Sequence, residues 1–328
     1  MKEHEIRNRD AHNKYLELVR RDSEELIKTG TFLESPCPAC GCSRSTQQFR
    51  KDQFTYVGCD ECETIYVNPR PDAQSLGLVY KESESTRFWV NDFFLPVAEA
   101  RRQKIFRPRA EFIAQSFPEN VRGRVADVGA GFGFFLEELR TSWPHAEFTA
   151  IEPSVEMAAI CRAKGLNVVE AFAESLDPKL HQFDLITCFE LFEHLHDPWT
   201  FLRRMHALLA PNGLIFMTTL NGLGFDIQVL WSASKAVSPP HHLNFANPHA
   251  MKILLERSGF IPVEISTPGQ LDWDIVESST VAEHAEPGRF FQSVIKHGSP
   301  EAKRSLQEWI RNNNFSSHMR VVARKVMP

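Results

Sequence analysis

The sequence predicts an α/β protein in which a mostly parallel sheet carries helices on both faces and a small cysteine-bearing segment precedes it. Three observations lead to this fold class. Strand-like apolar runs alternate with helical patterns from residue 124 onward, one strand runs directly into a glycine-rich turn, and two C-x-x-C pairs stand upstream. Repeated strand–helix units favour parallel strands, because each helix carries the chain back across the sheet.

Three segments precede the alternating region. Residues 1–34 are predicted as a polar N-terminal helix with a thin apolar stripe, and residues 35–72 as a short, turn-rich segment that holds the paired cysteines. Residues 73–118 alternate aromatic and charged residues at roughly helical spacing, which predicts a helical linker or cover. Its aromatic residues are expected in the helix core, with a substrate lid as the alternative. Its arginines are expected on a solvated face, with phosphate contact as the alternative. The aromatic residues are Phe88, Trp89, Phe93 and Phe94, and the arginines are Arg101, Arg102, Arg107 and Arg109.

The predicted main domain spans residues 119–328. A helical insertion at about 270–315 interrupts it, and residues 316–325 return as a last strand beside the sheet. The other predicted strands lie at 124–129, 146–153, 167–172, 183–190, 213–220 and 261–266, and the predicted helices at 132–143, 155–165, 198–209 and 249–260.

Length, charge and cysteine content limit the class of protein. A chain of 328 residues with 42% hydrophobic residues can bury a sizeable core. The net charge of -5 gives no general attraction to phosphate backbones, which disfavours a nucleic-acid partner. The N-terminus is charged and lacks the apolar core of a signal peptide, and turn residues break the longest uncharged run, so neither secretion nor a membrane span is expected. Seven cysteines without a signal indicate a reducing, cytoplasmic compartment.

The cysteine pairs predict a metal site. Cys37 and Cys40 form one C-x-x-C knuckle, and Cys59 and Cys62 form a second one 18 residues further on. This spacing is typical of a zinc ribbon in which four thiolates hold one tetrahedral ion. Four protein ligands leave no open position, so the zinc is expected to be structural. Four unrelated thiols are the alternative. Cys42 is expected to be free, and Cys161 and Cys188 are expected as small buried apolar residues.

The glycine-rich turn predicts a nucleotide-like ligand. The stretch VADVGAGFGFFLEEL, residues 125–139, runs from a strand through Gly129, Gly131 and Gly133 into a helix. Glycines let the backbone turn tightly and approach a ligand closely. The pattern departs from the dinucleotide fingerprint, because Phe134 stands where a third glycine is needed and Asp127 precedes the first glycine by two residues. A carboxylate there favours a ligand that lacks a pyrophosphate and carries positive charge. A plain strand-to-helix turn is the alternative.

These residues resemble the first motif of class I S-adenosylmethionine (SAM)-dependent methyltransferases, which have a Rossmann-like fold. The resemblance covers about residues 120–265 and the final strand, and it implies SAM as cofactor. It implies that Glu152, at the end of the second strand, accepts hydrogen bonds from the ribose hydroxyls. It places Ala173 and Glu174 near the adenine, with a solvated loop acid as the alternative for Glu174. It also places Phe189 and Glu190, in the stretch ITCFELFEHLHDP, in the cofactor pocket.

A pair of histidines follows the fifth predicted strand in SPPHHLNFANP, residues 238–248. That loop crosses the carboxyl edge of the sheet, where ligands bind in this topology, so His241 and His242 are candidates to face the methyl acceptor. The region resembles sugar C-methyltransferases with an N-terminal zinc ribbon. Their loop holds an acid–His pair, with His241 here at the acid position and His242 matching the base. His194 is a second candidate, and Tyr80 matches a position that closes over the site. The alternatives are loop packing or helix capping for His241 and His242, structural hydrogen bonding for His194, and core packing for Tyr80.

The expected function is transfer of a methyl group from SAM to a small polar acceptor, with the hydroxyl of a nucleotide-linked sugar or glycan as the first choice. An RNA methyltransferase that uses the ribbon as an RNA clamp and a non-catalytic interaction protein are the alternatives. The acidic charge weighs against the former, and the intact cofactor motif weighs against the latter. A nicotinamide oxidoreductase is disfavoured because position 134 is not glycine.

Overall fold

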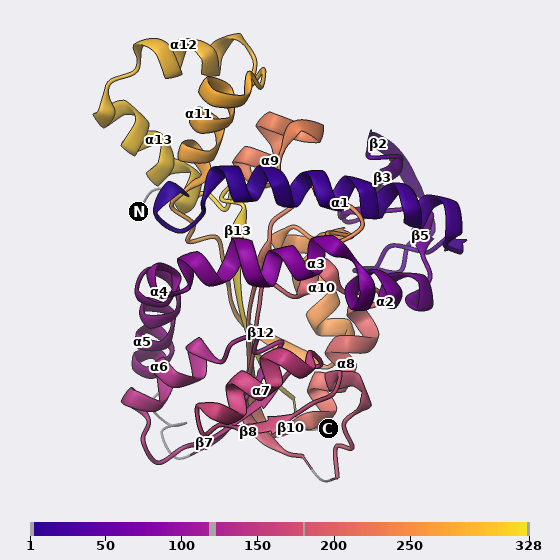
Figure 1. The fold of residues 1–328 in the computed structure, drawn as a ribbon, viewed down its shortest axis with the longest axis vertical. Helices are drawn as coiled ribbons and strands as arrows, with labels where there is room; N and C mark the ends of the chain where they lie inside the picture. Colours follow the sequence, from indigo (N-terminus) through magenta and orange to yellow (C-terminus); the bar gives the residue numbers. More distant parts are fainter. Residues whose placement is uncertain (1–2, 118–122, 180, 327–328) are drawn as a thin grey trace.

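A computed structural model describes residues 3–117, 123–179 and 181–326. Within these residues the central sheet has seven strands in the order β12-β13-β10-β9-β6-β7-β8. Strands β8, β7, β6, β9 and β10 are parallel, and β13 runs antiparallel to both β10 and β12 (Figure 1). The strands are β6 (Arg124–Val128), β7 (Glu147–Ile151), β8 (Asn167–Val169), β9 (Phe183–Phe189), β10 (Leu209–Leu220), β12 (Phe260–Ser266) and β13 (His318–Lys325). The predicted α/β class with a mostly parallel sheet is therefore confirmed.

Alternate residues of each strand point to opposite faces of the sheet, and each face has its own layer of helices. On one face Val125 and Leu185 belong to a core shared with α5, α6 and α7. On the other face Ala126 and Ile186 belong to a core shared with α8 and α10. Burial on both sides explains why the strands are almost continuously apolar. The helices are α5 (Arg107–Ser116), α6 (Phe134–Ser142), α7 (Val155–Ala163), α8 (Pro198–Leu208) and α10 (Pro248–Arg257).

The cysteine segment builds a second, four-stranded sheet in the order β11-β4-β3-β2. Its outer strand β11 does not come from the cysteine segment. It comes from the loop after β10, where Asn244 pairs with Tyr66 and Phe245 with Ile65. The strands are β2 (Ser45–Lys51), β3 (Phe54–Cys59), β4 (Ile65–Val67) and β11 (Asn244–Phe245), and a separate pair joins β1 (Phe32–Leu33) to β5 (Arg70–Pro71). The two parts of the chain therefore share one sheet.

Helices lead into and out of this small sheet. The short turn η1 (Glu3–Glu5) precedes the long helix α1 (Arg9–Thr29), and after β5 the chain forms a run of short helical pieces. Phe94 in this run stacks on Phe132 of the glycine turn, with ring centroids 5.0 Å apart. The aromatic run therefore covers the glycine turn as well as packing internally. The pieces are α2 (Ala73–Glu82), α3 (Glu84–Phe88), the π-helical η2 (Trp89–Phe94), η3 (Leu95–Val97), α4 (Ala98–Arg101) and the π-helical η4 (Arg102–Phe106).

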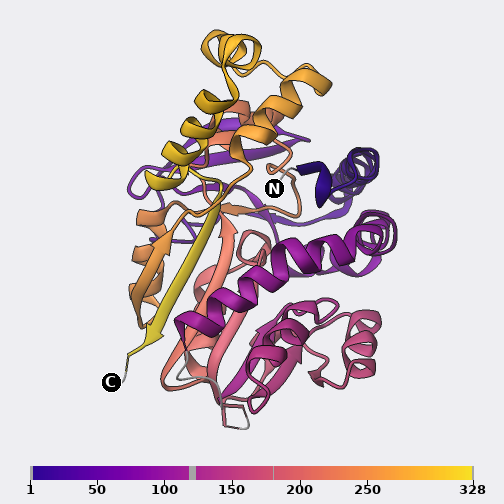
Figure 2. The same ribbon diagram turned by 90° about the vertical axis from the view of Figure 1, so that its left-hand side faces the viewer.

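Three helices precede the last strand, in the stretch expected to be a helical insertion. They are α11 (Asp272–Glu283), α12 (Arg289–His297) and α13 (Pro300–Asn312), and they stand together at one end of the molecule (Figures 1 and 2). Strand β13, yellow in Figure 2, then runs back along the sheet. The remaining short elements are η6 (Ala173–Ser175), η7 (Phe192–His194), α9 (Phe225–Leu230) and η8 (Trp231–Ala233). None of the helices in the described part of the chain is long and apolar enough to cross a membrane.

The division of the chain at residues 34, 72 and 118 stays a prediction. The last of these boundaries lies outside the described residues, since description stops at residue 117 and resumes at residue 123.

Candidate active site

The glycine turn connects β6 to α6 with three residues in the left-handed backbone region. Gly129, Gly131 and Gly133 have φ values of 70°, 55° and 72°. A Cβ added to Gly133 would lie 2.8 Å from a methyl of Leu166, so the inner side of the turn is tightly packed. A Cβ added to Gly131 would meet no atom of the described residues within 4 Å. The outer side of the turn is therefore open at Gly131, as a cradle for a ligand requires.

Two acids lie behind this open side. Asp127, in β6, is 2% exposed, and its carboxylate accepts a hydrogen bond from the Thr187 hydroxyl at 2.7 Å. Burial raises the pKa of Asp127 to about 7. Glu152, just after β7, is 5% exposed and accepts hydrogen bonds from the backbone N–H groups of Gly131 at 2.8 Å and Ser154 at 2.9 Å. Burial raises the pKa of Glu152, while these N–H groups oppose the rise.

The other predicted cofactor residues follow the next two strands. Ala173 and Glu174 lie in η6, with Ala173 buried and Glu174 half-buried. Phe189 ends β9 and lies beneath the Arg109 guanidinium, 4.4 Å from the ring centroid. These residues share the carboxyl edge of the sheet with the glycine turn, on the two sides of the point where strand order reverses between β6 and β9. In open α/β sheets this is the place where a ligand binds.

Glu190 is held in an uncommon conformation at this edge, with φ of 51°. Its carboxylate accepts a hydrogen bond from the Thr218 hydroxyl at 2.7 Å and lies 3.3 Å from Arg109 and 3.5 Å from His318. Burial disfavours the ionised form of Glu190, but the charges of His318 and Arg109 and the Thr218 hydroxyl hold its pKa below the usual range. The expectation of a solvated face is wrong for Arg109, whose side chain is only 12% exposed. No sequence pattern indicated the Arg109 and His318 contacts, because both residues come from distant segments.

The predicted histidines meet next to this edge. The imidazole rings of His194 and His242 lie 4.7 Å apart between centroids, and His241 lies 6.5 Å from His194. The Tyr80 hydroxyl is 3.2 Å from Nδ1 of His194 and donates to the backbone carbonyl of His241 at 3.2 Å. Ser85, which no sequence signal identified, is 3.3 Å from Nε2 of His241. The structure therefore brings all four predicted residues into one cluster.

Burial keeps these imidazoles neutral. It lowers the pKa of His241 to about 3 and that of His242 to about 4, and it lowers the pKa of His194 well below the usual range. The positive charge that the neighbouring imidazoles would carry adds to the effect at His194 and His241. Neutral imidazoles have a lone pair for a proton or a metal ion.

The cysteine pairs form one compact cluster. One sulfur atom each from Cys37, Cys40, Cys59 and Cys62 lies within 4.8 Å of all the others. The Cys37–Cys62 and Cys40–Cys59 sulfur distances are 3.5 and 3.4 Å, close to the roughly 3.8 Å edge of a tetrahedron with zinc–sulfur bonds of about 2.3 Å.

The backbone around each knuckle follows the same pattern. The residue after each pair, Gly41 and Glu63, has positive φ and donates its N–H to the carbonyl of the first cysteine. Cys42 stands outside the sulfur cluster. The donor set and its geometry therefore fit a structural zinc ion.

The cysteine segment also holds the histidine loop in place. The Tyr56 hydroxyl donates to the carbonyl of His242 at 2.9 Å, and the Val67 N–H donates to the carbonyl of Leu243 at 3.0 Å. The Asn247 amide donates to the carbonyl of Cys62 at 2.8 Å, which ties the loop directly to a predicted zinc ligand. Together with the β4–β11 pairing, these bonds make the cysteine segment a support for the histidines. The sequence did not indicate this contact.

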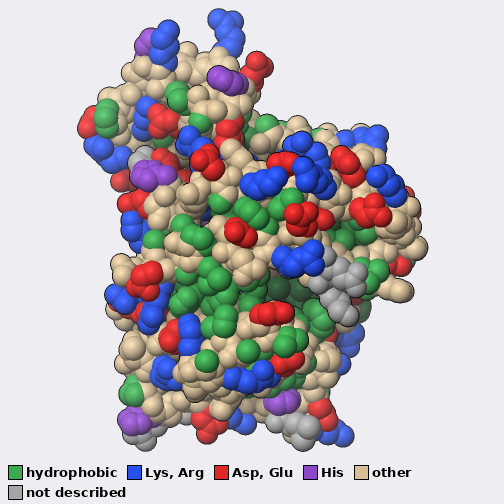
Figure 3. Space-filling view, viewed as in Figure 1, with side chains coloured by type: hydrophobic (Ala, Val, Ile, Leu, Met, Phe, Trp, Pro, Cys, Tyr) green, Lys and Arg blue, Asp and Glu red, His purple; other side chains and the backbone are tan. Residues whose placement is uncertain are grey.

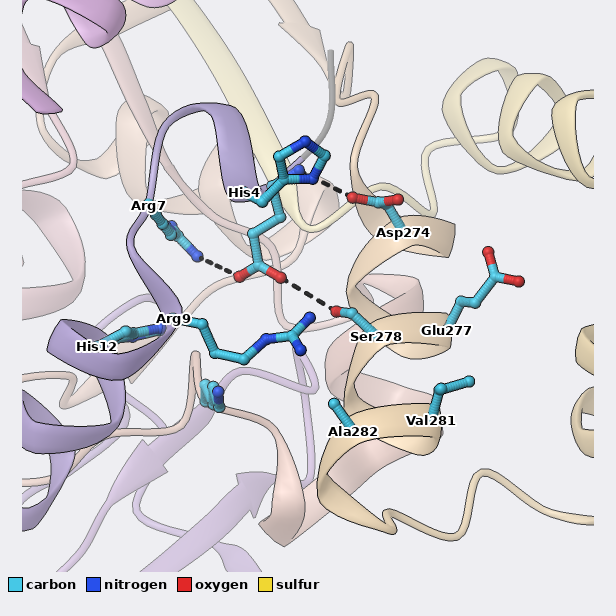
Figure 4. A pocket seen from close by; sticks show the side chains of 11 residues that line it. His4, Arg7, Arg9, His12, Asp274, Glu277, Ser278, Val281 and Ala282 are labelled. Atoms are coloured by element: carbon cyan, nitrogen blue, oxygen red, sulfur yellow. Dashed lines mark hydrogen bonds and ion pairs between the residues drawn. The ribbon is translucent and has the colours of Figure 1, made fainter.

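A hollow with hydrophobic side chains opens near the middle of one face, below α1 (Figure 3). A separate cavity of about 370 Å³ lies between η1, the start of α1 and α11 (Figure 4). There the Glu3 carboxylate is paired with Arg7 at 3.4 Å and accepts a hydrogen bond from the Ser278 hydroxyl at 3.1 Å. The residues that line this cavity include none of the predicted cofactor or acceptor residues. Hydrogen bonds from the Glu3 N–H to Asp274 and from the Ser278 hydroxyl to Glu3 join the N-terminal turn to α11 across this cavity.

The sheet order and the acid–glycine turn at its carboxyl edge define a class I SAM-dependent methyltransferase. A family model described as a methyltransferase domain matches residues 97–265, and the chain belongs to this family.

Curated relatives carry the name of one methyltransferase. The chain is 28% identical over 171 residues to a ubiquinone biosynthesis O-methyltransferase of Xanthomonas axonopodis pv. citri (strain 306), covering 48% of this chain and 70% of the relative. It is 33% identical over 105 residues to the enzyme of that name from Xanthomonas oryzae pv. oryzae (strain PXO99A), covering 30% of this chain and 43% of the relative.

The solved structure of the plantazolicin methyltransferase BpumL in complex with S-adenosylhomocysteine (SAH) is 14% identical. The match covers 77% of this chain and 94% of that chain with a TM-score of 0.47. The resemblance to sugar C-methyltransferases finds no support among these relatives.

Proposed function

We propose that this methyltransferase transfers the methyl group of SAM to a hydroxyl oxygen of a small polar acceptor bound at the histidine cluster. One observation carries the proposal. Strand β9 ends at Phe189, directly before the predicted cofactor residue Glu190, and four residues after Glu190 the chain reaches His194 in the cluster. The two predicted sites therefore adjoin at the carboxyl edge of one sheet, which a methyl transfer between them requires.

The cofactor is proposed to lie along the glycine turn. SAM is proposed to contact the backbone at the open side of Gly131, and Gly129 and Gly133 form the rest of the turn. Asp127 stabilises the positive charge of SAM from behind the turn, and Glu152 accepts hydrogen bonds from the ribose hydroxyls with the acceptor capacity that two backbone N–H groups leave free.

The remaining cofactor residues are proposed to surround the two ends of SAM. Ala173 and Glu174 lie beside the adenine. Phe189 and Glu190 line the pocket where the reactive end of SAM meets the acceptor. When bound, SAM supplies an electrophilic methyl group on a positively charged sulfur.

His242 is proposed to take the proton of the acceptor. A carbonyl can only accept a hydrogen bond, so Nδ1 of His242, 2.5 Å from the Ala236 carbonyl oxygen, carries hydrogen. Nε2 of the neutral ring then has the lone pair. In the transfer the acceptor O–H proton passes to this nitrogen, the oxygen forms a bond to the methyl carbon, and SAH leaves with the electron pair of the broken C–S bond. His241, His194 and Tyr80 are proposed to position the acceptor.

The zinc ribbon is proposed as the support of this loop. The zinc ion would be held by Cys37, Cys40, Cys59 and Cys62. Hydrogen bonds that involve Tyr56, Val67 and Asn247 connect the ribbon to the histidine loop and hold the loop in position. Four thiolate ligands need reducing conditions, so we place the protein in the cytoplasm. These contacts favour a positioning role over an RNA clamp, because they are directed at the acceptor loop.

The acceptor is proposed to be a nucleotide-linked sugar or glycan hydroxyl. The sugar acceptor rests on the sequence motifs alone, namely the paired cysteines and His242 next to a methyltransferase domain, since the relatives named above are not sugar methyltransferases. The relatives named O-methyltransferases support oxygen as the methylated atom.

A turnover screen tests the proposal. Purified zinc-loaded protein is incubated with SAM and a panel of nucleotide sugars, glycans and phenols, and SAH production is measured. We expect turnover with a nucleotide sugar or glycan, lost in His242→Ala and kept in His249→Ala, a variant of an exposed histidine on α10. Turnover with phenols alone would show that the acceptor is a phenol and not a sugar. RNA binding that weakens steeply with salt, with methylation of that RNA, would replace the small acceptor.

A further inference from the structure

We propose that Glu193, His194 and His242 form a second metal site, for a divalent transition-metal ion that binds the acceptor oxygen. One carboxylate oxygen of Glu193 and one ring nitrogen of each histidine lie within 4.8 Å of one another. Glu193 follows Glu190 by three residues and contacts the acceptor loop directly, since its carbonyl accepts the Leu243 N–H at 2.7 Å. The site therefore lies between the cofactor residues and the acceptor loop.

The hydrogen bonds around His194 leave it a free lone pair. The Tyr80 hydroxyl lies 3.2 Å from both the His241 carbonyl oxygen and Nδ1 of His194. A tyrosine has one hydroxyl hydrogen, and a carbonyl can only accept it; when that hydrogen is donated to the His241 carbonyl, the tyrosine oxygen accepts from Nδ1–H of His194. Nε2 of His194 then has the lone pair. His242 has the same arrangement, because its Nδ1–H donates to the Ala236 carbonyl.

Glu193 is held in the same way. It is 2% exposed, and the Thr219 hydroxyl donates to its Oε2 at 2.8 Å. Each of the three side chains is therefore oriented by a hydrogen bond from outside the cluster, to a carbonyl, a tyrosine or a threonine. Metal ligands in proteins are oriented by partners of this kind, which fix the tautomer and direct the free lone pair at the ion.

One ligand atom from each of the three side chains lies within 4.8 Å of the other two. Within the described residues, no hydrogen bond joins the side chains of Glu193, His194 and His242 to each other. Buried acceptors that face one another are unfavourable unless a positive charge lies between them. A cation satisfies all three at once. A proton on Glu193 is the other candidate, and the experiment below separates the two.

The ligand set selects the class of ion. Two imidazoles and one carboxylate suit Mn²⁺, Fe²⁺, Co²⁺ or Zn²⁺, whereas Mg²⁺ and Ca²⁺ prefer oxygen ligands alone. Three protein ligands leave coordination positions open for an acceptor hydroxyl. An ion bound to that oxygen lowers the pKa of the hydroxyl, so its proton passes to water before the oxygen attacks the methyl carbon and SAH leaves.

This inference rests on the proposed function for placing the acceptor at the histidine cluster. It changes one step of that function. While the ion is bound, the lone pair of His242 is donated to the ion, and His242 acts as a ligand in place of a proton acceptor.

Metal binding by the zinc-loaded full-length protein tests the inference. Mn²⁺ is titrated and followed by electron paramagnetic resonance, because Mn²⁺ does not compete for the thiolates of the ribbon. We expect one saturable Mn²⁺ site, weakened at least about tenfold in Glu193→Gln and His242→Asn and unchanged in the exposed His249→Asn. Co²⁺ should give the spectrum of a nitrogen and oxygen site without thiolate charge transfer.

Absence of saturable Mn²⁺ binding, or binding that neither substitution weakens, overturns the inference. The remaining explanation for the cluster is then that Glu193 is protonated. SAH binding, measured on every variant, reports whether the variant is folded, and Thr219→Val is a second variant that loosens Glu193 without removing it. The two proposals fail differently. Failure of the proposed function shows as absence of turnover with every acceptor, whereas failure of the metal site alone leaves turnover that Mn²⁺ does not change.

Discussion

The two halves of the proposed active site are built in opposite ways. The cofactor half comes from one continuous run of β–α units. Its proposed cofactor residues lie at or shortly after the carboxyl ends of successive strands. The acceptor half is assembled from segments far apart in the chain. Tyr80 comes from α2, His194 from the turn after β9, and His241 and His242 from the loop after β10, and a cysteine-bearing sheet holds that loop from outside.

This difference predicts that the halves fail separately. The glycine turn is fixed by its own backbone and by the sheet, so we expect it to keep its conformation when the ribbon unfolds, although the cysteines share a core with β6 and β7. The histidine loop depends on β4, Tyr56 and Asn247, so it loses its position when the ribbon unfolds. Substitutions that do not share partners have additive effects, and the predictions below ask whether this holds between the halves.

Loss of the ribbon has the largest expected effect. In Cys59→Ser the zinc equivalent held by the four cysteines should be lost, because structural zinc binding by such sites contributes about 10 kcal/mol or more to folding of the segment. Turnover should be lost, while SAH affinity stays within about twofold of wild type. Zinc content, turnover and SAH calorimetry are the measurements. The control is Cys42→Ser, which lies outside the sulfur cluster. Loss of SAH binding along with zinc would show that the halves are not separable.

Removal of the proposed proton acceptor should affect the acceptor half alone. His242→Ala is expected to lower turnover about 10²- to 10⁴-fold, the usual contribution of a positioned acid or base, and to leave SAH affinity unchanged. The matched control is His249→Ala on the surface of α10. Full turnover in His242→Ala would assign the loop a packing role.

Substitutions of two glycines in the turn separate an effect on stability from an effect on cofactor binding. Both Gly131→Ala and Gly133→Ala place a side chain at positive φ, which costs about 1–2 kcal/mol of stability. Gly133→Ala also crowds Leu166 and Cys161, at a further cost of about 1–3 kcal/mol.

Gly131→Ala instead points its methyl into the open cradle and should weaken SAH binding at least about tenfold, or about 1.4 kcal/mol. Thermal unfolding and calorimetry separate the two effects. The prediction is wrong if the two variants lose stability and affinity in equal proportion.

The smallest effect concerns pH. Asp127 has a pKa of about 7 in the folded protein, raised by burial, against about 3.9 in an unfolded chain. Between these values the folded state binds the extra proton, so this group's contribution to stability falls as pH rises. The Thr187 hydroxyl and the Arg109 charge favour ionisation of Asp127, and Glu152 opposes it.

In Asp127→Asn the unfolding temperature should therefore fall less than in wild type between about pH 5 and about pH 8. SAM affinity should rise with pH in wild type, because a cation favours the ionised carboxylate, and be flat in the variant. Parallel unfolding curves across this range would contradict the assignment.

The sequence indicated the sheet and the cofactor half because their signals are local. Gly129, Gly131 and Gly133 are separated by single residues, and the apolar runs fix the strands by themselves. It indicated the four clustered cysteines because two C-x-x-C knuckles are local as well.

The acceptor half was only partly predictable. The histidines stood out by type, but no pattern singled out Glu193, the proposed third ligand, although it stands directly before His194 in FEHLH. The pairing of β11 with β4 had no signal, because a two-residue strand has no periodicity and its partner lies far away in the chain. Contacts of Arg109 and Ser85 depend on how distant helices pack, which a pattern does not encode.

The most direct test of the account is calorimetric titration of SAH into zinc-loaded wild type and Glu152→Gln, with NADH as the control ligand. The account predicts micromolar binding of SAH to wild type, affinity weakened at least about tenfold in Glu152→Gln, and no heat with NADH. Folded, zinc-loaded wild type that does not bind SAH, or a Glu152→Gln variant that binds it as tightly as wild type, would contradict the placement of the cofactor along the glycine turn.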